Sequence, residues 1–222
     1  MTYARLFATT MRRPTSLAVL GQLILLAGAV YAAPAPAELA ALRGHARAID
    51  YDASLQKLPD GTSWIRTVVH VEAVFDGTLN EAVAILGDYE SYPKVFSRIS
   101  AVKLRSKAKG VTVMDQRNLV AVMGLRYETN LVFRSEFQPR GPGRMAETFA
   151  MTESDGSTRV SEGSWELEEV RLDSGPAVYL RYYCLIMVEP RFPMQLQIMQ
   201  SFGKADFVKT VEELGAEMRK RR

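Results

Sequence analysis

The alternation of apolar and polar residues predicts a domain built mainly of β-strands. In residues 64–75 apolar side chains occupy every second position, which is typical of a strand with one buried face. Further strand segments follow, and the turns between them contain Gly, Asp or Pro. These segments span residues 99–105, 111–122, 125–137, 144–152, 159–170 and 177–188. Consecutive strands joined by short turns indicate an antiparallel meander of about seven strands.

Helical patterns interrupt and then follow these strands. Thr78 and Glu81 have the spacing of a capping box, so a short helix is expected to begin there. A second short helix is expected over residues 89–97, with a kink or restart near Pro93. Residues 193–219 carry an apolar side chain at every third or fourth position, which predicts one long amphipathic helix.

The N-terminal segment has the composition of a secretory signal peptide. Residues 1–32 combine arginines, an apolar run and a small-residue end. We expect cleavage near Ala32, because the apolar run is shorter than the ~20 residues of a membrane-spanning helix. An uncleaved anchor is the alternative. The protein is therefore expected to be exported, either to the periplasm or to the medium.

The segment that follows is predicted to be an extension of the folded domain. Residues 33–62 begin as an Ala/Pro-rich linker. Residues 38–49 have the apolar spacing of a short helix, although residues 49–57 could instead begin a strand. The folded domain itself is predicted to span residues 63–222.

The charge balance argues against nucleic acid as a partner. The full chain has a formal net charge of +3, but its first 32 residues hold three arginines and no acidic residue. The 25 basic residues that remain are balanced by 25 acidic ones, so the domain lacks the usual positive surface of nucleic-acid-binding proteins. The basic residues at 219–222 are interpreted as a solvated helix end, with transient contact to an anionic membrane as the alternative.

The predicted elements leave room for an internal cavity. A helix of about 27 residues is roughly 40 Å long, and so is a strand of about 12 residues. The helix can therefore lie along a twisted sheet that curls around it. Because one helix is only about 10 Å wide, it cannot fill the concave face of a wide sheet, and a pocket is expected beside it.

Three segments resemble a known family. They are residues 75–96, which contain the stretch DYESYP at 88–93, the stretch GSWEL at 163–167, and the aromatic strand 179–190 that leads into the final helix. Over residues 64–219 the chain resembles the START/polyketide-cyclase (SRPBCC) superfamily, and most of all its coenzyme-Q-binding-like bacterial members. The resemblance implies an α+β helix-grip fold. In this fold a curved antiparallel sheet surrounds a long C-terminal helix, and two short helices follow the first strand.

The same resemblance implies a deep hydrophobic cavity, and the side chains expected to line it are mostly aromatic or aliphatic. For each of them, plain core packing is the alternative. The expected ligand-binding residues are Tyr89, Tyr92, Phe96, Leu125, Tyr127, Leu131, Phe133, Phe149, Trp165, Leu167, Ile198 and Phe202.

Charged residues within the strands are expected to face solvent. Asp115, Arg117 and Glu147 are the clearest examples, although one of them could point inward as an acid or a polar anchor. Cys184 is the single cysteine, so it is expected to be buried and inert.

The motifs that carry chemistry are missing from the sequence. It contains no phosphate-binding Gly-rich loop, no paired histidines at metal spacing and no nucleophile elbow. We therefore expect a monomeric protein without metal, cofactor or catalytic residues that binds a lipid or another hydrophobic small molecule. The alternatives are a cyclase, dehydratase or hydrolase that uses the same cavity, and an interaction module whose interior is filled.

Overall fold

The computed structural model describes residues 34–122 and 125–222. The predicted signal peptide and its cleavage near Ala32 lie outside these residues. The described elements belong to one unit, Ala35–Arg222.

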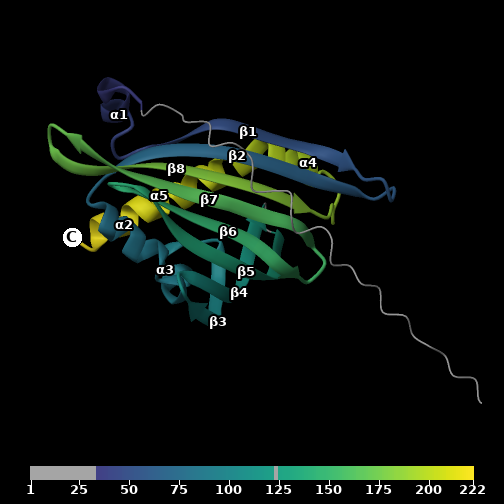
Figure 1. Cartoon of the computed structure of the whole chain (residues 1–222). Helices are drawn as coiled ribbons and strands as arrows, with labels where there is room; N and C mark the ends of the chain where they lie inside the picture. Colours follow the sequence, from purple (N-terminus) through teal and green to yellow (C-terminus); the bar gives the residue numbers. More distant parts are fainter. Residues whose placement is uncertain (1–33, 123–124) are drawn as a thin grey trace, which may run out of the picture. The chain divides into compact units, whose positions relative to one another are not determined.

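In the described residues, eight strands form a single antiparallel sheet (Figure 1). The strands are β1 (Ala46–Lys57), β2 (Ser63–Asp76), β3 (Ile99–Ala108), β4 (Val111–Val122), β5 (Leu125–Gly141), β6 (Arg144–Ser154), β7 (Thr158–Leu172) and β8 (Gly175–Val188). Their order across the sheet is β1-β2-β8-β7-β6-β5-β4-β3. The predicted meander is thus confirmed from β3 to β8, and β2 extends the sheet by pairing with β8.

The first strand was not expected in full. The helix predicted over residues 38–49 is only α1 (Pro36–Ala41), and β1 pairs with β2 along its whole length. The helix ends at Ala41 with Leu42 as its C-cap, and Gly44 then turns the chain toward β1 with a φ of +77°, a left-handed conformation that glycine tolerates best. Ile49, which seemed to continue the helical stripe, is 52% exposed. Residues 46–57, assigned from the sequence to the extension, are therefore part of the sheet, which has eight strands instead of about seven.

Two short helical segments follow β2, as predicted. The capping box forms at the start of α2 (Leu79–Leu86), where the Glu81 carboxylate accepts a hydrogen bond of 2.6 Å from the Thr78 amide. The second segment is a 3₁₀ turn, η1 (Tyr89–Ser91), continued by α3 (Tyr92–Val95). The Tyr92 hydroxyl donates to the Leu86 carbonyl oxygen at 2.6 Å and ties α3 to the end of α2.

The predicted long helix contains an irregular first part. It begins as α4 (Gln195–Ile198), passes through a π-helical turn, η2 (Met199–Gly203), and continues as α5 (Lys204–Lys220). Met194, directly before α4, has a φ of +64°. Helical structure thus extends over nearly the predicted length, from Gln195 to Lys220. The π-helical turn interrupts it, and α5 is its long regular part.

Helix α5 packs against the β1–β2 side of the sheet, with α2 and α3 beside it (Figure 1). Phe207, Val211, Leu214 and Met218 form its buried stripe. Gly215 lies against the Phe75 ring, and this close contact lets the helix approach β2. The basic C-terminal residues are not all free in solvent, since Arg221 pairs with Glu217 at 2.7 Å.

Candidate functional site: an internal cavity beside the C-terminal helix

A cavity of about 210 Å³ lies between the C-terminal helical segment and the inner face of the sheet. Along β7 it is lined from Thr158 to Trp165, a distance of about 24 Å at 3.4 Å per residue. Phe202 of η2 borders the cavity and is 55% exposed, so the cavity reaches the surface beside η2. The interior of the described domain is thus not filled by side chains.

The position of α5 explains why this space stays open. The helix packs on β1 and β2, whereas β4 and β5 lie on the far side of the curled sheet. Alternate residues of β4 and β5 therefore face the cavity instead of a helix. These residues are Met114, Gln116, Asn118, Tyr127, Thr129, Leu131 and Phe133.

One end of the cavity has an aromatic wall. Phe96 contacts Tyr92 and Trp165, with ring centroids 4.9 and 6.2 Å apart. Tyr182 continues the wall between Trp165 and Phe149, at 4.3 and 6.3 Å. All five side chains line the cavity. Such rings offer a large apolar contact area together with weakly polar edges.

Glu147 lies in this apolar end, contrary to the expectation that it faces solvent. It is 2% exposed, and Met145 and Phe149 on the same face of β6 pack against the core. The strand period alone would place Glu147 on the side of Met145 and Phe149, so the signal was present in the sequence. Of the other two charged residues, Arg117 is exposed and Asp115 pairs with Arg105 at 2.7 Å.

The Glu147 carboxyl is held by two hydroxyl groups. Its Oε1 atom is 2.9 Å from the Tyr89 hydroxyl and is also hydrogen-bonded to the Ser135 hydroxyl. The Oε2 atom is buried and has no partner among the described residues. Burial raises the pKa of Glu147 to about 7, although the hydrogen bonds from Ser135 and Tyr89 oppose this rise. The cavity wall therefore contains a carboxyl group that titrates near neutral pH.

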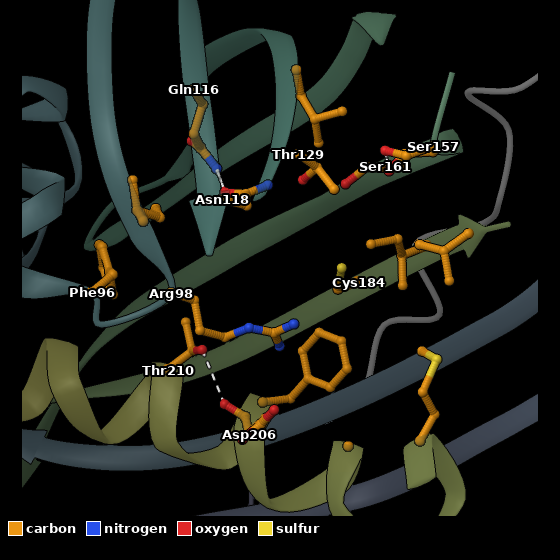
Figure 2. Close-up of a pocket in the computed structure, with 18 of the residues that line it drawn as sticks. Phe96, Arg98, Gln116, Asn118, Thr129, Ser157, Ser161, Cys184, Asp206 and Thr210 are labelled. Carbon is orange, nitrogen blue, oxygen red and sulfur yellow. Dashed lines mark hydrogen bonds between the residues drawn. The ribbon is translucent and has the colours of Figure 1, made fainter. Parts of the chain in front are cut away.

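Polar and charged side chains also line the cavity (Figure 2). Gln116 donates to Asn118 at 2.7 Å on β4. Arg98, at the junction of α3 and β3, extends into the cavity from the side of the short helices and lies over the Phe207 ring at 5.3 Å. Asp206 lines the cavity from α5. The cavity is thus amphipathic, with an aromatic end and a charged region.

The structure brings most of the predicted ligand-binding residues together around the cavity. The predicted residues that line it are Tyr92, Phe96, Tyr127, Leu131, Phe133, Phe149, Trp165, Ile198 and Phe202. Two others lie behind its wall: Tyr89 contacts Glu147, and Leu167 is packed in the core. The side chain of Leu125 lies outside the described residues. Arg98 was not identified from the sequence, because nothing in its neighbourhood distinguishes it from a surface arginine.

Cys184 lines the cavity but has the character of a buried, unreactive thiol. Burial raises its pKa to about 11, so the thiolate is scarce at neutral pH. Across the described parts of the chain, no group of three or more His, Cys, Asp or Glu side chains is placed to bind a metal ion. None of the helices in those parts is both long and apolar enough to span a bilayer.

Comparison with known proteins relates the chain to others by fold. No protein-family model and no curated protein matches it by sequence. Human StAR-related lipid transfer protein 5 superposes with a TM-score of 0.56 at 12% identity, covering 76% of this chain and 86% of that one. A STAR-related lipid transfer protein from Xanthomonas axonopodis superposes with a TM-score of 0.53 at 16% identity, covering 75% of this chain and 98% of that one. The Zhui aromatase/cyclase from Streptomyces sp. R1128 superposes with a TM-score of 0.55 at 13% identity, covering 70% of this chain and 95% of that one. The chain therefore has the START-type helix-grip fold.

Proposed function

We propose that the protein binds a lipid or another hydrophobic small molecule in the internal cavity and passes it on to an acceptor. The observation that carries this proposal is the cavity itself, which is lined largely by aromatic and aliphatic side chains and opens beside η2. Moving apolar ligand surface from water into such a site is favourable by about 25 cal/mol per Å². Two of the proteins that share the fold are named as lipid transfer proteins, which supports the same function here.

The direct test is native mass spectrometry of protein purified without detergent, followed by extraction and identification of any bound lipid. A neutral fluorescent probe, Nile red, measures occupancy of the cavity independently. The variant Ser161→Phe places a ring in the cavity wall, and Ile186→Phe makes a smaller change in the same wall. Ser106→Phe on the exposed side of β3 is the matched control.

We expect both cavity variants to weaken Nile red binding and the control to leave it unchanged. Circular dichroism identifies a variant that has failed to fold, and the milder Ile186→Phe then provides the measurement. Equal binding by the wild type and both folded cavity variants would place the probe elsewhere and refute the proposal.

An enzyme that uses the same cavity is the second candidate, and Glu147 is the observation that favours it. A carboxyl group with a pKa near the working pH is suited to general acid–base catalysis. A dehydratase, or a cyclase that closes a ring by condensation, would release one water from its substrate, so Glu147→Gln should accumulate a bound molecule heavier by one water than the wild-type ligand. Identical bound molecules in Glu147→Gln and in the wild type would support a binding function without catalysis.

The location of the protein and its nearest relatives are also proposals. We propose export to the periplasm or the medium, supported by the signal-like pattern of residues 1–32. We also propose that the coenzyme-Q-binding-like START proteins are the nearest relatives, supported by the DYESYP stretch at residues 88–93. Cell fractionation of the full chain and of a form lacking residues 1–32 tests the first proposal, and cytoplasmic retention of both would contradict it.

A further inference from the structure

Arg98 is a cation that lines the cavity and has no ion-paired partner among the residues that the structure describes. It follows α3 and precedes β3, it is partly buried, and it lines the cavity. Among the described residues no hydrogen bond or ion pair involves its guanidinium group. Its guanidinium carbon lies 5.3 Å from the centroid of the Phe207 ring. A ring face can attract the positive charge, but it leaves the five N–H donors for oxygen acceptors.

The other charged side chains around the cavity do not neutralise Arg98. Arg191 pairs with Glu189 at 3.6 Å, so these two charges compensate each other. Glu147 is held by Tyr89 and Ser135 at the aromatic end. Asp206 lines the same cavity, but no ion pair joins it to Arg98.

The charge of Arg98 also acts on groups within the cavity. Burial raises the pKa of Tyr127 and of Cys184, and the Arg98 charge opposes the rise in both cases. Both residues line the cavity. The positive potential of Arg98 is therefore present in the space that a ligand would occupy, and a partly desolvated site strengthens it relative to water.

We infer that Arg98 binds an oxyanion, a carboxylate or a phosphate, at one end of an amphipathic ligand whose apolar part lies along the aromatic wall. The planar guanidinium presents paired donors that match the two oxygens of either group. Trp165 and Tyr182 provide the apolar surface for the remainder of the ligand. This inference rests on the proposed function, because it names the class of ligand for the same cavity.

The test compares ligands that differ only in the head group. Dodecanoate, dodecyl phosphate and the neutral dodecanol compete with Nile red at about pH 8, where a carboxylic acid is ionised. We expect the wild type to bind at least one anion roughly tenfold or more tightly than the alcohol, as a charge-assisted hydrogen bond implies. The comparison of dodecanoate with dodecyl phosphate shows which oxyanion the site prefers.

Substitutions then assign the preference to one side chain. Arg98→Met should weaken binding of the anions by a much larger factor than binding of dodecanol and so remove the preference for the anion, while Arg98→Lys should retain part of that preference. Arg140→Met, at an exposed arginine of β5 away from the cavity, is the matched control and should behave like the wild type. Asp206→Asn removes a negative charge from the cavity wall and should strengthen anion binding.

Two results would overturn the inference and leave the proposed function standing. One is equal affinity of the wild type for the anions and the alcohol, and the other is an anion preference that persists in Arg98→Met. In both cases displacement of Nile red would still show an occupied cavity. Failure of the folded wild type to bind Nile red or any of the three competitors would refute the proposed function and this inference together.

Discussion

Replacing Glu147 by Gln should change how the stability of the protein depends on pH. Glu147 is buried, and its pKa rises from 4.5 to about 7 on folding. The native state therefore keeps its proton between about pH 4.5 and pH 7, where the unfolded chain has lost it. The native state holds more protons than the unfolded chain in this pH window. The protonated carboxyl therefore contributes its full stabilisation below about pH 4.5, and this contribution is lost as the pH rises through 7.

The size of the effect follows from the pKa difference. Each pKa unit corresponds to 1.36 kcal/mol, so Glu147 should reduce the free energy of unfolding by roughly 3 kcal/mol between about pH 4.5 and pH 8. Gln retains the size and the hydrogen-bonding capacity of the protonated carboxyl but does not titrate. The variant should therefore become more stable, relative to the wild type, by about that amount across the window.

Urea unfolding monitored by circular dichroism at several pH values measures this difference. Subtracting the unfolding free energy of the wild type from that of the variant at each pH cancels the contributions of all other titrating groups. Glu90→Gln, at an exposed residue of η1, is the matched control for removal of one carboxyl group. If the free-energy difference between Glu147→Gln and the wild type stays constant from about pH 4.5 to pH 8, Glu147 is not a buried carboxyl with a raised pKa.

Three further predictions concern the packing around the cavity. Gly215→Ala would place a Cβ atom 2.3 Å from a Phe75 ring carbon. It should therefore lower the free energy of unfolding measured in urea by about 1–3 kcal/mol, despite the better helix propensity of Ala. Equal or higher stability would show that the Phe75 ring moves freely. Leu214→Ala removes a wholly buried side chain of α5 and should cost roughly 2–5 kcal/mol, and a loss well below that range would mean that the site collapses around the smaller residue. Cys184 has a pKa raised to about 11 by burial, so a thiol reagent at neutral pH should react with it only after unfolding, and prompt reaction with the native protein would contradict its burial.

The regular elements could be predicted because each depends on residues that are close in the chain. The apolar repeat of two residues over 64–75 predicted the strand that forms β2. The apolar side chains at every third or fourth position near the C-terminus predicted the helix that contains α5. The capping box at Thr78 and Glu81 formed as its spacing indicated. The helix predicted over residues 38–49 forms only as far as Ala41, and from Ala46 the pairing with β2 selects a strand.

Most of the residues that were expected to bind a ligand line the cavity, but the expected set contained neither Glu147 nor Arg98. Glu147 shares a strand face with Phe149, and its role depends on Tyr89, which is 58 residues away in the chain. Arg98 enters the cavity because a short helix ends just before it and because Phe207 of α5 lies beneath it.

Local periodicity by itself determined most of the strands and helices, because these depend mainly on the geometry of neighbouring residues. It did not determine β1, which forms by pairing with β2. The tertiary structure decided that α5 lies over β1 and β2, and this position leaves the opposite part of the sheet uncovered. It also decided which charged groups enter the open space, because their burial depends on the curvature of the sheet and on partners far away in the chain.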